Sequence, residues 1–193
     1  MSTCLILLAA GFGRRMRGAD KHLERVQGHP VLRMLAMRGL EAGLEVIVTV
    51  PELTHPRAEV LRGLDVTRVP VPDAASGMAA SFRAALAECS ARDAMFLPGD
   101  MPDITTGDLS KIAGAEGMIV QATSEDGLPG HPVRFHESLF EELRQLQGDT
   151  GARTVLKRHS DHVTRIALPA HHAVTDLDTP EEWAAWRAGQ ATQ

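Results

Sequence analysis

The sequence predicts an α/β fold with three layers, in which helices cover both faces of a mostly parallel, Rossmann-like central sheet. Two observations carry this prediction. Short β-branched or apolar runs alternate with helical patterns of about ten residues along much of the chain. Neighbouring parallel strands joined in this way need right-handed crossovers. No internal repeat or long linker occurs, so we expect one domain over residues 1–193.

Glycine, proline and short apolar runs mark the first elements. The run 4–8 is long enough for one buried strand, and Pro30 opens a helix over 31–42 that has an apolar stripe. A β-branched strand is expected at 45–50. The following elements are expected as a weak helix at 56–61, a strand at 65–71, a helix from 76 or 77 to 89, a strand at 94–97, a helix from 105 or 106, and a strand at 118–123.

The second half of the chain is less regular. Residues 127–132 are rich in turn formers, and the later elements are expected as a short strand at 133–135, helices at 137–146 and 152–158, and a strand at 163–168. Thr179 and Glu182 form a capping box with Pro180 in the first turn of a last helix. Trp183 and Trp186 are expected to pack in the core of the protein rather than to stack on a base.

Composition narrows the class of protein. The net charge is −5, so a nucleic-acid or anionic membrane partner is not expected. Two cysteines, Cys4 and Cys89, lack a metal-ligand spacing, and we expect a reduced, cytoplasmic protein. The apolar start has no basic residues before it and is expected to be a strand rather than a signal peptide. No run approaches the ~20 apolar residues that are needed to cross a bilayer. We also expect the protein to be a monomer.

The stretch 5–21, LILLAAGFGRRMRGADK, holds the strongest functional signal. A buried strand leads into small residues and then into four cations, Arg14, Arg15, Arg17 and Lys21. Small residues let the main chain approach a ligand, and successive N–H groups in such a turn bind anions. The stretch therefore predicts a nucleoside triphosphate site. The alternative is a glycine turn followed by solvated arginines.

Two other phosphate loops lack required residues here. The dinucleotide fingerprint begins with Gly11 and Gly13, but Met16 stands at its third glycine, which disfavours a Rossmann oxidoreductase. A Walker A loop would match Gly13 and Gly18, but Lys21 comes too late.

Further candidate segments follow other predicted strands, where open α/β sheets bind ligands. The segment 76–81 opens a helix, whose free N–H groups attract anions. Asp100 lies between turn residues after a buried strand, where a carboxylate can hold a metal ion. Asp176 and Asp178 precede the last helix. The alternatives are helix caps for the two serines of 76–81, surface acids for Asp176 and Asp178, and a solvated side chain for Arg153.

These segments form blocks that span nearly the whole chain: Leu8-Ala9-Ala10-Gly11-x-Gly13-x-Arg15-Met16 with Asp20-Lys21, Gly77-Met78-Ala79-Ala80-Ser81, Leu97-x-Gly99-Asp100-Met101-Pro102, Gly130-His131-Pro132-Val133, Gly148-Asp149-x-Gly151-Ala152-Arg153, and Asp176-Leu177-Asp178-Thr179-Pro180. In this order they resemble the MobA-like nucleotidyltransferases, and among them most the molybdenum cofactor cytidylyltransferases. The resemblance implies the nucleotide-diphospho-sugar transferase (GT-A) type of fold.

The resemblance also implies a reaction and its partners. CMP would pass from CTP to the terminal phosphate of a molybdenum-pterin cofactor with release of pyrophosphate and with Mg²⁺ as cofactor. Guanylyl-transferring relatives usually carry glycine where this chain has Ala10, so Ala10 favours CTP. A molybdoenzyme client or its chaperone is a further candidate partner. Since the attacking phosphate is already an anion, positioning and charge neutralisation would suffice without a general base.

By resemblance, the site residues fall into four groups. The catalytic residues would be Arg15, Lys21 and Asp100. The nucleotide-binding residues would be Leu8, Ala9, Ala10, Gly11, Gly13, Arg14, Arg15, Lys21, Ser76, Gly77, Met78 and Ser81. The acceptor-binding residues would be Gly130, His131, Pro132 and Arg153. The metal ligands would be Asp100 and Asp178, assisted by Asp176.

Three alternatives remain open at this point. The loop before Asp20 is slightly longer than the compact form in the family, which leaves the reach of Lys21 and the acceptor undetermined. A guanylyltransferase of the same pathway, or a transferase making a sugar or alditol nucleotide, would use the same chemistry. A binding protein without turnover is a further alternative, although such a protein would not require the metal carboxylate.

Overall fold

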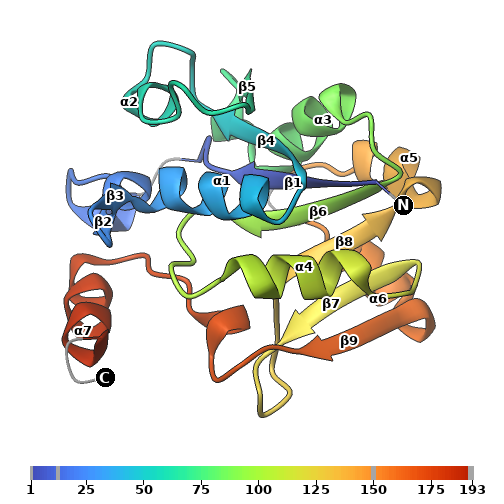
Figure 1. Cartoon of the computed structure of the whole chain (residues 1–193). Helices are drawn as coiled ribbons and strands as arrows, with labels where there is room; N and C mark the ends of the chain where they lie inside the picture. Colours follow the sequence, from blue (N-terminus) through green and yellow to red (C-terminus); the bar gives the residue numbers. More distant parts are fainter. Residues whose placement is uncertain (1, 12–13, 149–150, 191–193) are drawn as a thin grey trace.

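The computed structural model describes residues 2–11, 14–148 and 151–190. Its centre is a seven-stranded sheet in the order β5-β4-β1-β6-β8-β7-β9 (Figure 1). The strands are β1 (Thr3–Leu8), β4 (Glu45–Val50), β5 (Thr67–Pro70), β6 (Asp93–Pro98), β7 (Ile119–Thr123), β8 (Pro129–His136) and β9 (Val163–Ala167). A separate hairpin is formed by β2 (Arg25–Val26) and β3 (His29–Pro30).

The helices connect these strands. They are α1 (Val31–Glu41), α2 (Pro56–Glu59), α3 (Met78–Glu88), α4 (Thr106–Gly114), α5 (Phe140–Arg144), α6 (Arg153–Arg158) and α7 (Pro180–Gln190). Short 3-10 helices occur at η1 (Arg14–Met16), η2 (Lys21–Leu23), η3 (Ala74–Ser76), η4 (Glu137–Leu139), η5 (Ser160–His162) and η6 (His172–Val174). None of these described helices is both long and apolar enough to cross a bilayer.

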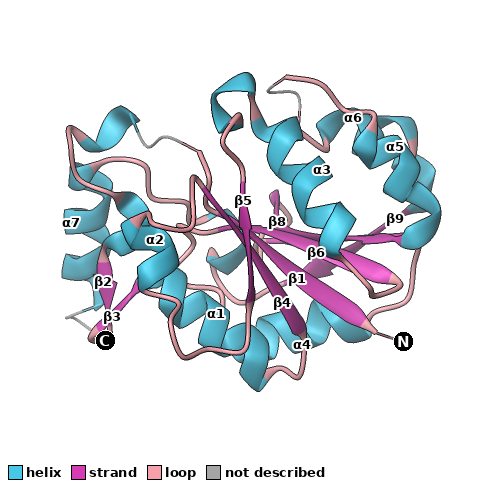
Figure 2. Cartoon of the chain, turned by 90° about the horizontal axis from the view of Figure 1, so that it is seen from above, coloured by secondary structure: helices cyan, strands magenta, loops and turns pink. Residues whose placement is uncertain are grey.

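Helices cover both faces of the sheet, which confirms the three-layer prediction. One face packs against α1 and α4, and the other against α3, α5 and α6 (Figure 2). Alternate residues of β1 serve the two layers, because successive strand side chains point to opposite faces. Leu5 and Leu7 contribute to the first core, whereas Cys4 and Ile6 contribute to the second. The protein core therefore lies on both sides of β1, which is an interior strand of the sheet.

The direction of the strands decides where a ligand can bind. Strand β1 runs parallel to β4 and β6, β4 to β5, and β7 to β9, whereas β8 runs antiparallel between β6 and β7. The beginning of β8 therefore lies at the same edge as the carboxyl ends of the parallel strands. In Figure 1 these strands point to the left, toward α7 and the β2–β3 hairpin.

Two local expectations were wrong. The turn-rich segment 127–132 already belongs to β8 from Pro129 onward, because the pairing of β8 with β6 and β7 outweighs local turn preference. Pro30 precedes the first helical residue of α1 and pairs in β3 instead. The start of α3 agrees with the second of its two expected positions: Ser76 lies in η3, and Gly77, whose φ of 115° favours glycine, is the N-cap of α3.

The end of the chain follows its prediction. Glu182 and Thr179 exchange the hydrogen bonds of a capping box, with the Thr179 amide donating to Glu182 and the Glu182 amide donating to the Thr179 hydroxyl. Trp183 is 1% exposed and packs edge to face on Trp186. Both tryptophans therefore have the structural role expected of them, and α7 is anchored directly after Asp178.

Candidate active site

Two cations and two carboxylates meet at the edge toward which the parallel strands point. Lys21 Nζ donates to Asp100 Oδ2 at 2.5 Å and to Asp178 Oδ1 at 2.6 Å. Arg15 Nη2 pairs with Asp178 Oδ2 at 2.5 Å. Lys21 and Arg15 follow β1, Asp100 follows β6, and Asp178 precedes α7. The structure thus brings together residues that are far apart in the sequence.

Main-chain bonds hold these segments in place. The Leu177 amide donates to the Asp100 carbonyl at 3.3 Å, so the tail segment is joined directly to the loop after β6. The amide of Asp178 donates to the Glu182 carboxylate at 2.7 Å, which anchors Asp178 to the start of α7. A Cβ on Gly99 would lie 2.8 Å from the His22 ring, so the loop can lie this close to η2 only without a side chain there.

The charges in this cluster influence one another. Burial alone would lower the pKa of Lys21, but the carboxylates of Asp100 and Asp178 raise it, so the ammonium stays protonated. Burial and the charges of Asp100 and Asp178 raise the pKa of Asp176. Asp176 forms no ion pair within the described part of the chain. It therefore lies near the cluster without being tied into it.

The carboxylates suit a divalent ion that also contacts a substrate. Asp100 is 2% exposed, and its buried Oδ1 has no hydrogen-bond partner among the described residues. No group of three or more potential metal ligands occurs in residues 2–11, 14–148 and 151–190. Mg²⁺ commonly uses one or two carboxylates together with substrate phosphates and water. Asp100 and Asp178 fit that shared arrangement, and the donor set does not fit an all-protein cage.

The described part of the loop after β1 is held by neighbouring strands. The Leu8 carbonyl accepts from the Gly99 amide at 3.1 Å, and the Ala9 amide donates to Thr49 Oγ1 at 3.1 Å. Ala10 is buried and packs against Val71 and Ala80. Gly11 is exposed at the end of this segment. Gly13 and the side chain of Arg14, both expected at the nucleotide site, lie outside the described residues.

The segment 76–81 lies at the start of α3. Ser76 and Met78 are exposed, whereas Ser81 is buried in the helix. The Ala79 amide donates to the Gly148 carbonyl at 3.1 Å, so the segment that leads to α6 lies against this helix start. Two of the blocks on which the family resemblance was based are therefore neighbours.

Three of the expected acceptor residues, Gly130, His131 and Pro132, lie at the beginning of β8, whereas Arg153 is the first residue of α6. Burial lowers the pKa of His131, and the charges of Asp100 and Arg153 also act on it. The buried Nδ1 of His131 has no partner in the described ranges. A Cβ on Gly130 would lie 1.9 Å from the Ala173 carbonyl oxygen, so β8 can approach η6 only without a side chain there.

Sequence reasoning missed Arg57, which lies beneath the loop. It is 5% exposed and contacts Ala9, Gly11 and Asp20. Its position after β4, in the first turn of a weak helix, was the available signal. An arginine in a short polar segment usually remains solvated, so this signal was not distinctive.

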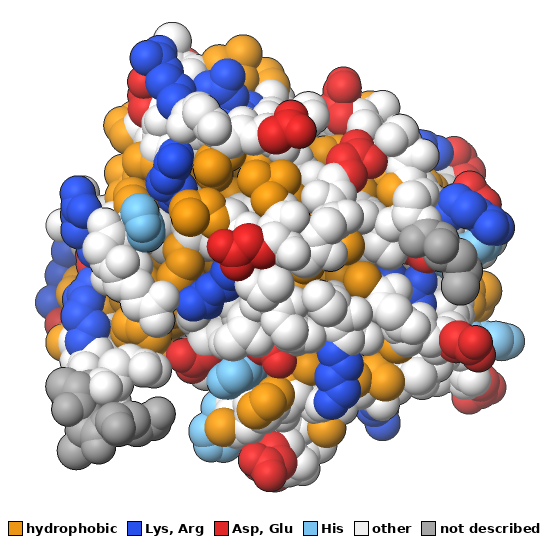
Figure 3. Space-filling model, viewed as in Figure 1, with side chains coloured by type: hydrophobic (Ala, Val, Ile, Leu, Met, Phe, Trp, Pro, Cys, Tyr) orange, Lys and Arg blue, Asp and Glu red, His pale blue; other side chains and the backbone are white. Residues whose placement is uncertain are grey.

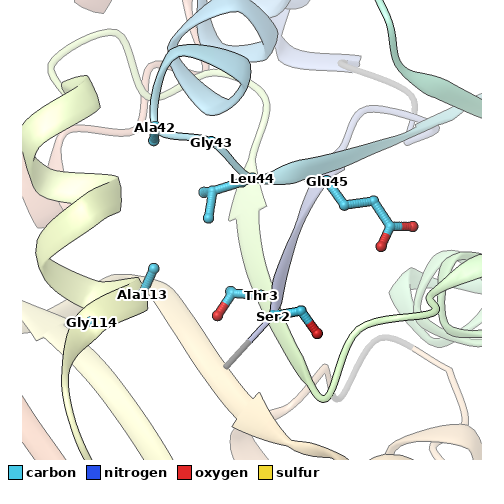
Figure 4. Close-up of a pocket in the computed structure, with 8 residues that line it drawn as sticks. All are labelled: Ser2, Thr3, Ala42, Gly43, Leu44, Glu45, Ala113 and Gly114. Carbon is cyan, nitrogen blue, oxygen red and sulfur yellow. The ribbon is translucent and has the colours of Figure 1, made fainter.

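The surface agrees with a site at this edge. In the space-filling view, several Lys and Arg side chains gather on the side toward which the parallel strands point (Figure 3). A separate hollow of about 340 Å³ lies at the amino-terminal ends of β1 and β4, where its lining is formed by residues 2–3, 42–45 and 113–114 (Figure 4). Its one carboxylate, Glu45, accepts from Ser90. This hollow lacks the charged groups of the candidate site.

Comparison with known proteins places the chain among nucleotidyltransferases. A family model described as "MobA-like NTP transferase domain" matches residues 5–163. A molybdenum cofactor guanylyltransferase from Serratia proteamaculans (strain 568) is 26% identical over 188 residues, which make up 94% of this chain and 92% of that protein. A molybdenum cofactor cytidylyltransferase from Escherichia coli (strain K12) is 25% identical over 119 residues, 62% of this chain and 61% of that protein.

A solved structure shares the fold. The crystal structure of Rv0371c from Mycobacterium tuberculosis H37Rv is 26% identical, with a TM-score of 0.83 over 96% of this chain and 97% of that one. A second structure of Rv0371c, with a TM-score of 0.77, is a complex with manganese. These comparisons confirm the family resemblance drawn from the six sequence blocks. They include relatives named for guanylyl and for cytidylyl transfer.

Proposed function

Because this chain belongs to the MobA-like NTP transferase family, we propose that it transfers CMP from CTP to the terminal phosphate of a molybdenum-pterin cofactor. The observation that carries this proposal is the cluster of Arg15, Lys21, Asp100 and Asp178 at the carboxyl edge of the sheet. Such a cluster can hold a triphosphate and a divalent ion together. We also propose that residues 1–193 work as one nucleotidyltransferase domain.

The reaction depends on neutralising the negative charge of the phosphates rather than on proton transfer. An oxygen of the acceptor phosphate forms a bond to the α-phosphorus of CTP, and the bond from that phosphorus to the pyrophosphate oxygen breaks. The attacking oxygen is already ionised, so no side chain has to remove a proton. Lys21 and Arg15 would bind the triphosphate and stabilise the negative charge that grows on the leaving pyrophosphate.

Asp100 and Asp178 would hold the divalent ion, with Asp176 assisting. When bound, the ion neutralises and orients the reacting phosphate. We propose Mg²⁺ for this role, since carboxylate oxygens are its preferred protein ligands. The manganese complex of Rv0371c supports a divalent ion in a relative. Lys21 now bridges the two carboxylates and would turn toward the triphosphate when the ion binds.

The remaining residues define two subsites. The main chain at Leu8–Gly11 would bind the base, with the nucleotide also contacting the exposed start of α3. Gly130, His131 and Pro132, together with Arg153, would face the acceptor, and the unpartnered Nδ1 of His131 supports a polar contact there. Ala10, buried beside Val71 and Ala80, stands where guanylyl-transferring relatives usually carry glycine, and for that reason we propose the smaller pyrimidine as the base.

Guanylyl transfer is the second candidate function. Of the two named relatives, the guanylyltransferase aligns over the larger share of this chain, 94% compared with 62%. The chemistry would be unchanged, and only the base subsite would differ. A transferase that makes a sugar or alditol nucleotide would differ at the acceptor subsite instead.

A nucleotide screen tests the proposal. Purified protein is incubated with Mg²⁺, each of the four nucleoside triphosphates, and either molybdenum-pterin cofactor or a sugar phosphate, and pyrophosphate release is followed. The proposal predicts release with CTP and the pterin cofactor, and loss of that release in Asp100→Asn. Preferred release with GTP would favour the second candidate. If none of the combinations of nucleotide and acceptor releases pyrophosphate, the proposed activity is contradicted.

A further inference from the structure

A buried guanidinium joins both ends of the loop that carries the site cations. Arg57, in α2, donates from Nη1 to the carbonyls of Ala9 at 2.6 Å and Gly11 at 2.7 Å. From Nε it donates to Asp20 Oδ2 at 2.7 Å. Ala9 is the first residue after β1, and Asp20 directly precedes Lys21. One side chain therefore fixes the departure of the loop from the sheet and its return to η2.

The far end of this loop depends on the same contact. Asp20 Oδ1 accepts from the His22 amide at 3.0 Å and so caps η2, where Lys21 is the first residue. α2 contacts η2, and α2 lies on the side of the molecule toward which the parallel strands point (Figure 1). A shift of Asp20 would therefore move the backbone that carries the Lys21 ammonium.

Burial makes this arrangement rigid. The Arg57 side chain is 6% exposed and that of Asp20 is 19% exposed. Burial opposes the charge on Asp20, but hydrogen bonds from His22 and Arg57 hold the pKa of its carboxyl below the usual range. A buried charge left without its partner is costly, so each of these two groups restrains the other.

The geometry also requires arginine at this position. The guanidinium is a planar fork whose separate nitrogens reach the two carbonyls on one side and the carboxylate on another. A lysine has a single nitrogen and cannot take both places. The carbonyls of Ala9 and Gly11 accept from the same nitrogen, so both point toward α2.

We infer that Arg57 is a positioning residue for the nucleotide site: by holding Ala9, Gly11 and Asp20, it sets the backbone position from which Lys21 and Arg15 reach the triphosphate. This inference rests on the proposed function for its effect on turnover. The effect of Arg57 on the order of the backbone does not depend on any substrate. This effect and the effect on turnover can therefore be tested separately.

The test uses Arg57→Met and a matched control, Arg33→Met. Arg33, in α1, also donates from Nη1 to two carbonyls, those of Val60 and Arg62, but lies outside the site. Asp20→Asn and Arg57→Lys provide second variants that keep more of the packing. Each protein is assayed well below its melting temperature, with CTP, Mg²⁺ and the pterin acceptor. Hydrogen exchange of the amides at residues 19–24 is measured without nucleotide.

We expect Arg57→Met to lower kcat/KM by ~100-fold, the scale of a displacement of about 1 Å at a catalytic group. Amide exchange at residues 19–24 should quicken by at least ~10-fold, as expected when one hydrogen bond to a charged group is lost. Arg57→Lys should not restore either value. The losses of kcat/KM in Arg57→Met and Asp20→Asn should be non-additive when combined. Arg33→Met should change neither measurement.

Two outcomes would overturn the inference. One is a lower melting temperature in Arg57→Met with unchanged kcat/KM and unchanged exchange at residues 19–24, which would mark an ordinary packing role. The other is equal effects of Arg57→Met and Arg33→Met. If wild-type protein turns over no nucleotide, the proposed function fails, and the exchange measurement alone decides whether Arg57 orders the loop.

Discussion

Replacement of Lys21 by methionine should strengthen the binding of a divalent ion while it abolishes most turnover. The ammonium of Lys21 bridges the carboxylates of Asp100 and Asp178 at 2.5 and 2.6 Å. A divalent ion that uses these carboxylates has to displace the ammonium. Methionine keeps an unbranched side chain but has neither charge nor donor, so Lys21→Met removes the competitor and leaves the ligands.

The size of the effect follows from the two contacts that the ion replaces. A hydrogen bond to a charged group contributes roughly 1.5–3 kcal/mol, and about 1.4 kcal/mol corresponds to a tenfold change in affinity. The side chains of Lys21, Asp100 and Asp178 are 18%, 3% and 17% exposed, so solvent screens them only in part. Rehydration of the displaced ammonium offsets part of the gain. We therefore expect Mn²⁺ to bind roughly 10- to 100-fold more tightly.

The assay is a titration of the nucleotide-free protein with Mn²⁺, followed by the loss of the free-ion signal in electron paramagnetic resonance. Lys111→Met is the control, since Lys111 donates to the Ala167 carbonyl on the protein surface. Turnover of Lys21→Met should fall by at least ~100-fold, because a charge-stabilising donor is missing. Unchanged or weaker Mn²⁺ binding in Lys21→Met would refute the idea that the ammonium and the ion share one position.

Three further predictions concern the base subsite, acid stability and β8. Ala10→Gly should raise the ratio of kcat/KM for GTP to kcat/KM for CTP by ~10-fold or more, which is the discrimination expected from one methyl group in a pocket. An unchanged ratio would contradict the proposal that Ala10 sets the preference for CTP. Asp20→Asn should cost about 2 kcal/mol of stability at pH 7, because a buried guanidinium loses its charged partner. Since the folded pKa of Asp20 is lowered, its contribution is fully present above the unfolded value of about 3.9 and is lost only as pH falls from there through the lower folded value. Urea unfolding at pH 7 and pH 2 should therefore show a smaller difference between variant and wild type in acid, and a constant difference would exclude this cause. Gly130→Ala should lower stability by about 2–3 kcal/mol by collision with a backbone carbonyl, whereas Gly189→Ala, which meets nothing within 4 Å, should not destabilise; equal melting temperatures for the two variants would contradict the collision.

Much of the fold follows from local patterns. The strands at residues 4–8 and 45–50 are short, apolar or β-branched, and both were predicted with nearly correct bounds. The beginning of β8 was not, because Pro129 and Pro132 locally favour a turn. Its pairing with β6 and β7 is a long-range interaction that no local pattern contains. The short hairpin β2–β3 and the 3-10 helices were missed because elements of two or three residues are too short to show a periodic pattern.

The site was predictable in its parts but not in its contacts. The sequence places Asp100 after a strand and Lys21 after a glycine-rich loop, and the topology of an α/β sheet brings such positions to one edge. Which cation faces which carboxylate depends on the packing of α7 and η2, at opposite ends of the chain. Arg57 gave no distinctive signal in the sequence, because the two carbonyls and the carboxylate to which it donates come together only in the folded protein.

The most direct test of the central claim is a crystal structure of the protein with CTP and Mn²⁺, in which anomalous scattering locates the metal ion. We predict the metal between the carboxylates of Asp100 and Asp178, and the triphosphate in contact with Arg15 and Lys21. A metal bound elsewhere, with the Lys21 ammonium still bridging both carboxylates beside bound CTP, would contradict the account.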